Sequence, residues 1–255
     1  MLLKTLFALA SVVGFATAAW LGASMRRDGR RFDALLAGQI GAAPGSGEFV
    51  QELTHWVYTQ QGFAKNRNYF VFRRLGPTPM HVLEHGGDCS DKSRLLAALL
   101  NRFGMPATLV MLHRDAAGPA THTVVEVQYD GGRMAADPVF DIVFPAGNGK
   151  FHDVAALRDD PTLLPARLDA LTVERGSDDK VAYYKRETES YSWPKTINWE
   201  KSALLAWIGE RIRARGTDPA LVMRPAFLED PKRLLLYGSL LFGAATGGVA
   251  LLPVG

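Results

Sequence analysis

The single cysteine of the chain, Cys89, follows a Gly86-Gly87 pair and Asp88 and precedes leucines at helical spacing. The glycine pair predicts a turn, and aspartate is favoured at the N-cap of a helix. The leucines end at Gly104-Met105-Pro106, a combination typical of a helix C-terminus. We therefore expect Cys89 in the first turn of a helix with one buried face. There the helix dipole and the free backbone amides favour a thiolate, and the same amides can hold an oxyanion during acyl transfer.

A lone cysteine is more often a small buried side chain, so its partners decide the interpretation. Residues 122–129 alternate in polarity and predict a strand, followed by the hairpin loop Asp130-Gly131. This loop pairs Val124 with Asp137. His122 and Asp137 then share one face as diagonal neighbours, about 7–8 Å apart and within side-chain reach. A turn placed one residue later would separate them by four residues, and we therefore favour the first register.

These residues suit nucleophilic catalysis. A thiolate needs an imidazole to hold its proton, and the imidazole needs a carboxylate to fix its tautomer. His122 and Asp137 are expected on the sheet face that meets the cysteine helix. Asp141 has the same parity as Asp137 and is the alternative orienting carboxylate. With six histidines in the chain, a Cys-His-Asp order arises easily by chance, so the shared face carries the argument.

Four linked segments together resemble the transglutaminase-like superfamily: Gly87-Asp88-Cys89-Ser90-Asp91-Lys92-Ser93-Arg94-Leu95-Leu96, Phe103-Gly104-Met105-Pro106-Ala107, His122-Thr123-Val124-Val125-Glu126-Val127 and Asp137-Pro138. The resemblance covers about residues 75–145. It implies an α+β fold with a papain-like core, in which the cysteine helix packs on an antiparallel sheet. It also implies Cys89 as nucleophile, His122 as general base and acid, and Asp137 as orienting residue. The family's aromatic residue after the strand histidine is replaced by Val124, and no position matches a second oxyanion donor.

Other candidate sites are weaker. His81 and His85 lie one helical turn apart beside Glu84, but no third metal ligand accompanies them, so we expect a solvated or satisfied pair and no metal. The sequence contains no phosphate-binding glycine loop, nucleophile-elbow serine or dinucleotide fingerprint. We therefore expect no cofactor.

Composition places the candidate site between two membrane segments. The chain has 255 residues, 47% hydrophobic and 22% charged, with a net charge of +3, which excludes a disordered chain and gives no nucleic-acid signature. Residues 5–25 and 234–253 are free of charges and long enough to span a bilayer. A signal peptide cleaved after Ala16-Thr17-Ala18 is the alternative for the first. We favour an anchor because the apolar stretch continues through Trp20 and Leu21.

Small residues recur every fourth position in both segments, which predicts a close helix hairpin. They are Ala10, Gly14, Ala18 and Gly22 in the first segment, and Ser239, Gly243 and Gly247 in the second. The general abundance of Gly and Ala in membrane helices explains the pattern equally well. Basic residues flank both segments on the side of the intervening domain. The positive-inside rule therefore predicts that this domain is cytoplasmic and that both termini lie outside.

The predicted organisation has five parts. These are a transmembrane helix (1–25), a juxtamembrane linker (26–48), a transglutaminase-like domain (49–175), an aromatic and amphipathic extension (176–233) and a second transmembrane helix (234–253). In the extension we expect a helix over residues 200–215. Its aromatic residues are expected to form a satellite core or interfacial belt, with a carbohydrate- or membrane-facing surface as the alternative.

The predicted function is that of a membrane-anchored cysteine acyl-transfer enzyme acting on amide bonds through a thioester. Hydrolysis is favoured over cross-linking by analogy with bacterial members of the superfamily, which are often proteases. The expected partners are the lipid bilayer, a protein or peptide substrate near the membrane, and a membrane-protein partner. The alternative is a non-catalytic scaffold that uses its cleft to bind a partner in a membrane assembly.

Overall fold

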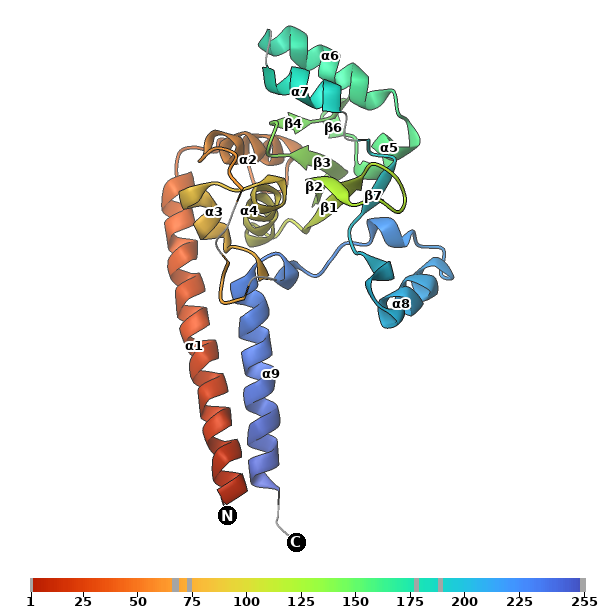
Figure 1. Ribbon diagram of the computed structural model, residues 1–255. Helices are drawn as coiled ribbons and strands as arrows, with labels where there is room; N and C mark the ends of the chain where they lie inside the picture. The colour runs from red at the N-terminus through yellow and green to blue at the C-terminus, as the bar shows by residue number, and fades with distance from the viewer. Residues whose placement is uncertain (1, 66–68, 73–74, 177–178, 188–189, 253–255) are drawn as a thin grey trace. The chain divides into compact units, whose positions relative to one another are not determined.

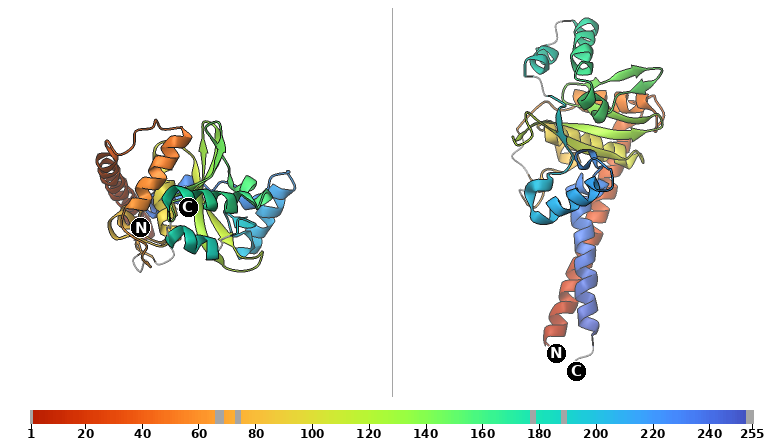
Figure 2. Two further views of the ribbon diagram at one scale, coloured as in Figure 1. Left: turned by 90° about the horizontal axis from the view of Figure 1, so that it is seen from above. Right: turned by 90° about the vertical axis from the view of Figure 1, so that its right-hand side faces the viewer.

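The computed structural model describes residues 2–65, 69–72, 75–176, 179–187 and 190–252. The ends of the chain form two long helices, α1 (Leu2–Leu36) and α9 (Pro231–Leu251), which run antiparallel and side by side (Figures 1 and 2). By length and composition, both could cross a membrane. The segment predicted as a linker from residue 26 begins as helix, because α1 continues to Leu36. Its arginines and leucines are strong helix formers, which explains the continuation.

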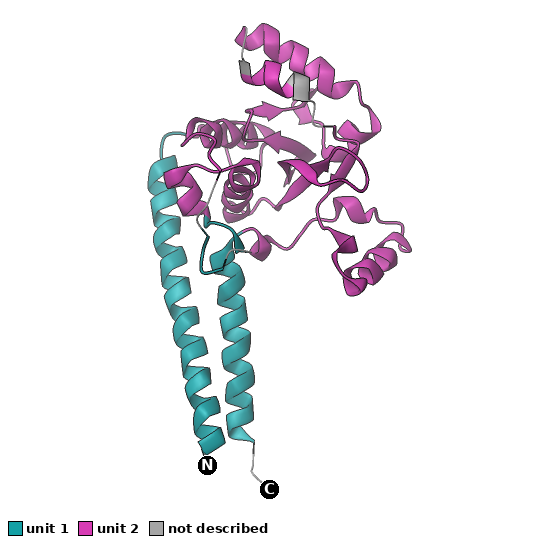
Figure 3. Ribbon diagram, viewed as in Figure 1, with its two compact units in different colours: residues 1–39, 68–78, 230–255 teal, residues 40–67, 79–229 magenta. Residues whose placement is uncertain are grey.

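The chain divides into two compact units (Figure 3). Residues 1–39, 68–78 and 230–255 form the first, and residues 40–67 and 79–229 form the second. The first unit contains both apolar helices. The second contains Cys89, His122 and Asp137.

Within the first unit, α1 and α9 approach closely at glycines. A Cβ on Gly14 would lie 2.9 Å from the Cα of Gly243, closer than side chains tolerate. The Ser11 hydroxyl donates a 2.8 Å hydrogen bond to the Gly243 carbonyl. Gly22, the last member of the predicted stripe, has no atom within 4 Å of a built Cβ and takes no part in the contact. The predicted hairpin therefore forms, but Gly22 does not lie on its contact face.

Polar contacts and an apolar exterior complete this unit. The Lys232 ammonium donates to the Ser24 hydroxyl at 2.9 Å and to the Asp28 carboxylate. Away from the contact, the two helices expose large apolar side chains, among them Leu6, Leu9, Val12, Val13, Leu241 and Phe242.

The second unit is built on a five-stranded antiparallel sheet with the order β4-β3-β2-β1-β7. Its strands are β1 (Ala107–His113), β2 (Ala120–Tyr129), β3 (Gly132–Asp137), β4 (Ile142–Val143) and β7 (Trp193–Lys195). Tyr129 pairs with Gly132 and Val125 with Ala136, so the predicted loop at Asp130-Gly131 and its register are confirmed. A separate hairpin joins β5 (Pro145–Gly147) to β6 (Lys150–Phe151).

Helices cover this sheet. α4 (Cys89–Arg102) packs on β1 and β2 and contacts α2 (Gly47–Thr59) and α3 (Pro79–His85). The face that carries His122 and Val124 packs instead against α5 (Val154–Asp159), α6 (Leu163–Arg175) and α7 (Asp179–Glu187). The expectation that the cysteine helix covers the His122 face is therefore wrong. Cys89 lies near His122 because it is the first residue of α4.

The C-terminal part of this unit belongs to the same compact body. β7 lies within the predicted extension, yet it pairs with β1 at the sheet edge. The helix expected over residues 200–215 is α8 (Ala203–Arg213), preceded by η2 (Trp199–Lys201) and followed by η3 (Pro219–Leu221) and η4 (Ala226–Leu228). Tyr184 and Tyr191 are buried in the core, whereas Tyr183 and Trp193 are exposed. The aromatic residues of this segment therefore do not form one surface.

Candidate functional site

Cys89 is the first residue of α4, as predicted from its sequence context. The Asp88 carboxylate accepts a hydrogen bond from the Asp91 amide at 3.1 Å. The Asp91 carboxylate accepts one in return from the Asp88 amide at 3.4 Å. This reciprocal capping box fixes the start of the helix. It holds Cys89 where the positive end of the helix dipole favours negative charge on sulfur.

The turn before Cys89 depends on glycine. Gly86 has a φ of +77°, and a Cβ built on it would lie 2.3 Å from the Gly62 carbonyl oxygen. Only glycine fits a position with both restrictions. The Ala64 amide then donates to the Gly87 carbonyl at 3.1 Å. The segment around Phe63 is thereby held beside the nucleophile and forms one wall of the site.

His122 lies on β2 next to a β-bulge. The β1–β2 register shifts at Leu112/His113, so Thr121 is the extra residue on β2. Bulges re-aim neighbouring side chains and are frequent near active sites. The His122 Nε2 atom donates to the Asp137 carboxylate at 2.7 Å, and the pair is almost completely buried. The predicted proximity of these two side chains is therefore present.

The Asp137 carboxylate is fixed on both oxygens. One oxygen accepts from His122, and the other accepts from the backbone amides of Val139 and Phe140 at 2.9 and 3.3 Å. With 0% of Asp137 exposed, water does not compete for these bonds. The turn after β3 thus orients the carboxylate, which in turn fixes the imidazole.

The environment of His122 favours its protonated form. Burial alone would lower the pKa of the ring. The charge and hydrogen bond of Asp137, with a further hydrogen bond to Cys89, outweigh burial and raise the pKa of His122 to about 10. Because Nε2 is bonded to Asp137, Nδ1 is the nitrogen left for Cys89. At neutral pH the imidazole is therefore cationic and lies between two groups that can carry negative charge.

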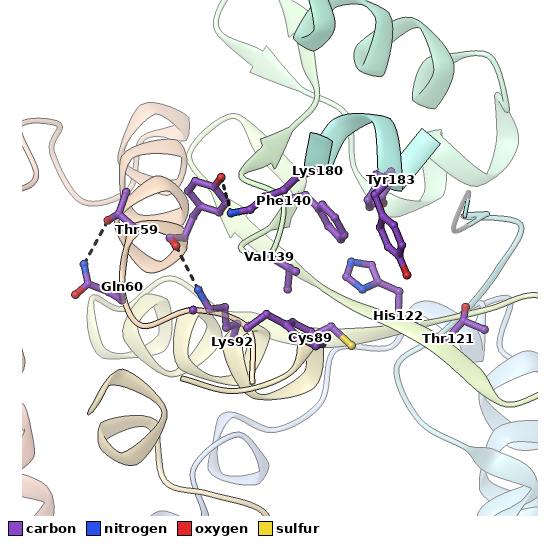
Figure 4. A pocket seen from close by; sticks show the side chains of 14 residues that line it. Thr59, Gln60, Cys89, Lys92, Thr121, His122, Val139, Phe140, Lys180 and Tyr183 are labelled. Atoms are coloured by element: carbon purple, nitrogen blue, oxygen red, sulfur yellow. Dashed lines mark hydrogen bonds between the residues drawn. The ribbon is translucent and has the colours of Figure 1, made fainter. Parts of the chain in front are cut away.

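A direct bond between α4 and β2 sets the distance between Cys89 and His122. The buried Ser93 hydroxyl, one helical turn after Cys89, donates to the Thr123 carbonyl at 2.8 Å. Thr123 is the neighbour of His122 on the strand. The structure therefore brings Cys89, His122 and Asp137 together, and Figure 4 shows the Cys89 sulfur beside the His122 ring.

A cavity of about 660 Å³ opens onto Cys89 and His122. Its size lies in the range of small-ligand pockets. Aromatic side chains line much of it: Tyr58, Phe63, Phe140, Tyr183 and Tyr184. Phe140 and Tyr184 contact the His122 ring edge to face, with centroids 5.5 and 5.9 Å away. These contacts shield the imidazole from water while leaving the sulfur accessible.

Two lysines of the cavity were not predicted from the sequence. Lys92 lies on α4, three residues after Cys89, and donates to the Val57 and Tyr58 carbonyls at 3.3 and 3.2 Å. Lys180 comes from α7 and donates to the Tyr58 hydroxyl at 2.9 Å. The i, i+3 spacing from Cys89 was the signal that could have identified Lys92. No local signal connects Lys180 to the site.

The alternative orienting residue is excluded by its contacts. The Asp141 carboxylate bonds to His55 Nδ1 at 2.8 Å and to the Arg175 guanidinium at 3.3 Å. It therefore serves a different histidine, and the alternative to Asp137 is wrong.

The other polar residues noted in the sequence make structural contacts. The His81 and His85 rings stack with centroids 4.2 Å apart, and no cluster of three potential metal ligands occurs among the described residues. Glu126, the glutamate of the strand motif, is buried. It accepts from the Val154 amide at 3.0 Å and from Arg133 at 3.3 Å. Burial raises the pKa of Glu126. This glutamate links β2 to the start of α5.

Residues 34–138 match the model of the transglutaminase-like superfamily. This stretch is therefore similar to the transglutaminase-like superfamily. Members of this superfamily typically perform cysteine-based acyl transfer. The matched stretch includes Cys89, His122 and Asp137, and the recognition and α+β fold predicted from the sequence are confirmed. Neither the curated proteins nor the solved structures gave a match.

Proposed function

We propose that this transglutaminase-like protein is a membrane-anchored cysteine acyl-transfer enzyme that acts on amide bonds. The main evidence is the buried hydrogen bond from His122 to Asp137, with Cys89 on the other side of the imidazole. This order of groups is what a cysteine nucleophile requires. The cavity that opens onto the sulfur supports the same assignment, because it provides access for an extended substrate.

In the proposed reaction, the Cys89 thiolate attacks the amide carbonyl carbon and a new C–S bond forms. The carbonyl electron pair moves to oxygen, where backbone amides at the start of α4 stabilise the negative charge. Collapse of this intermediate breaks the C–N bond. The imidazolium of His122 gives its proton to the departing amine, which leaves a thioester on Cys89 and a neutral imidazole.

The second half of the reaction reverses these roles. His122 accepts a proton from an incoming nucleophile, which attacks the thioester carbon, and the C–S bond breaks to restore the thiolate. Water as the nucleophile gives a carboxylate product, and an amine gives a cross-link. We favour hydrolysis, by analogy with bacterial members of the superfamily.

The membrane anchor of the proposal is the α1–α9 hairpin. Its apolar exterior has the length and composition of a membrane-spanning pair, and close contacts at Gly14 and Gly243 are typical of such helices. An anchored enzyme acts on substrates near the membrane, whether proteins, peptides or envelope material. The proposed location is the cytoplasmic membrane, with the catalytic unit on the cytoplasmic side by the positive-inside rule.

Complementation of a deletion strain tests catalysis against the scaffold alternative. We expect Cys89→Ser and Cys89→Ala to fail to restore function although both accumulate as folded protein, because neither provides a thiolate. Full restoration by both variants would support a non-catalytic scaffold.

A second experiment, with the fluorescent primary amine dansylcadaverine, distinguishes hydrolysis from cross-linking. Cysteine-dependent labelling of proteins would indicate cross-linking, whereas ¹⁸O from water in new carboxylates would indicate hydrolysis.

A further inference from the structure

Helix α8 is attached to the second unit through one side (Figure 1). A Cβ built on Gly209 would lie 3.2 Å from the Trp199 ring, so this side of α8 packs directly on η2. The Trp199 indole donates in turn to the Pro219 carbonyl of η3 at 2.8 Å. At the start of the helix, the Ser202 hydroxyl accepts a hydrogen bond from the Leu205 amide. α8 is therefore held by its Gly209 side and by its N-cap.

The side of α8 away from Gly209 is apolar. Leu204, Trp207 and Ile208 are three and four residues apart, which places them together on the helix surface. Leu204 is 66% exposed and Trp207 is 56% exposed, so the described part of the chain covers little of either side chain. A contiguous group of exposed apolar side chains is typical of an interaction surface.

Two arginines adjoin this apolar group. The Arg211 guanidinium lies 5.3 Å from the centre of the Trp207 ring. Arg215, in the turn after the helix, lines the same surface hollow as Trp207 and Arg211. The carboxylate of α8 itself, Glu210, pairs with Arg213. Within the described part of the chain, neither Arg211 nor Arg215 has an ion-pair partner. The exposed side of α8 therefore combines apolar side chains with two positive charges.

This combination is complementary to the surface of an anionic bilayer. Helices that lie in the membrane interface direct Trp and Leu towards the acyl chains and Lys or Arg towards the headgroups. A tryptophan ring suits the interface because it is apolar with one polar N–H. The long side chains of Arg211 and Arg215 can reach lipid phosphates while their stems stay beside the apolar group. The match therefore includes both polarity and charge.

The chain also keeps α8 close to a membrane. α9, one of the two helices that could span a bilayer, begins at Pro231, and residues 214–230 connect it to α8. This connection spans at most about 60 Å even when fully extended. Tethering at such a distance gives a high effective concentration of lipid, so weak contacts are sufficient for binding.

We propose that α8 is an interfacial helix that binds anionic phospholipid. Leu204, Trp207 and Ile208 insert below the headgroups, and Arg211 and Arg215 bind lipid phosphates. The inference rests on the membrane anchor of the proposed function and is independent of the chemistry at Cys89. It gives the second unit a membrane contact of its own, in addition to the two anchoring helices.

A fluorophore on α8 tests the proposal in the full chain. In a Cys89→Ser background, Leu204→Cys is labelled with nitrobenzoxadiazole, and the protein is reconstituted into phosphatidylcholine nanodiscs with or without phosphatidylglycerol. Val173→Cys on α6 is the matched control, because Val173 is also apolar and 85% exposed. In anionic nanodiscs we expect the α8 label to shift its emission to the blue and to be quenched about twofold or more by nitroxide-labelled lipid. The control label should show neither effect.

Charge variants test the role of the arginines. Arg211→Gln with Arg215→Gln should reduce the quenching severalfold, whereas Arg211→Lys with Arg215→Lys should retain most of it. The matched control removes two exposed charges elsewhere, Arg114→Gln with Lys150→Gln, and should leave the quenching unchanged. Quenching of the unaltered helix should be weaker in neutral nanodiscs.

An α8 label that remains solvent-exposed in anionic nanodiscs would overturn the proposal. A blue shift without nitroxide quenching would do the same, because it indicates a protein surface over α8, such as a second copy of the chain. Equal quenching in anionic and neutral nanodiscs, or equal quenching of the α6 label, would also contradict it. Failure of the anchor has a different signature: the protein separates from the nanodiscs in size-exclusion chromatography, which would contradict the anchor and this proposal together.

Discussion

The carboxylate of Asp137 determines the protonation of His122, and this makes it the most informative single residue to change. In Asp137→Asn, the charge that opposes the effect of burial is lost, so the pKa of His122 falls from about 10. We expect alkylation of Cys89 at pH 6 to slow by about tenfold or more, since less imidazolium is available to stabilise the thiolate. Asp141→Asn is the matched control, because Asp141 bonds to His55 instead. An equal effect of both variants would show that the carboxylate acts only through general stability.

The same pair predicts how stability depends on pH. The pKa of His122 in the folded protein, about 10, lies above the ordinary value of 6.5. The folded state therefore holds an extra proton between these values. The stabilisation is complete below pH 6.5 and is lost as the pH rises towards 10. Urea unfolding of the wild type and Asp137→Asn should differ by about 3–5 kcal/mol at pH 6, and by less at pH 10. Parallel pH profiles of the two proteins would contradict the ion pair.

At the scale of elements, the hairpin of α1 and α9 depends on one close contact. A larger side chain at Gly14 has no space, whereas Gly22 faces open space. In a Cys89→Ser background, Ser11→Cys with Gly247→Cys should form a disulfide readily, since a Cβ on Gly247 would lie 3.7 Å from that of Ser11. Adding Gly14→Leu should reduce the intramolecular cross-link severalfold, and adding Gly22→Leu should not. Equal yields in both variants would show that the helices do not meet at Gly14.

Local signals in the sequence were sufficient to predict the elements that position Cys89, His122 and Asp137. Asp88 and the leucine spacing predicted the start and the buried face of α4. The two-residue loop at Asp130-Gly131 determined the β2–β3 register, because a hairpin of that length permits one pairing. From this register alone His122 and Asp137 were expected to meet.

The rest of the site depends on long-range packing that sequence patterns do not encode. Alternation along β2 identified two faces but not which helices cover them, so α5 to α7 were not expected on the His122 side. β7 is three residues long and contains a proline, which is too weak a pattern to predict a strand. Lys180 reaches the cavity from a helix about ninety residues after Cys89 in the sequence, and only the folded chain brings them together.

For the whole molecule, the charge pattern around the two membrane segments predicts topology. Arg26, Arg27, Arg30 and Arg31 follow the first segment, and Arg224, Lys232 and Arg233 precede the second. Both groups favour a cytoplasmic catalytic unit with both termini outside. Alkaline phosphatase fused after the last residue should therefore be active in a bacterial host, and the protein should resist extraction by carbonate. An inactive fusion that remains in the membrane fraction would reverse the orientation without changing the proposed chemistry.

The assignment of Cys89 and His122 as an activated pair is the central claim, and the single cysteine makes it directly measurable. The rate of Cys89 alkylation by iodoacetamide is followed from pH 5 to 10 in the wild type, His122→Ala and the control His152→Ala. We expect rapid alkylation of the wild type and the control at pH 6, and a reaction at least about tenfold slower in His122→Ala. A wild-type profile like that of an ordinary thiol, with a pKa of about 8.5 and no change on removal of His122, would contradict the account.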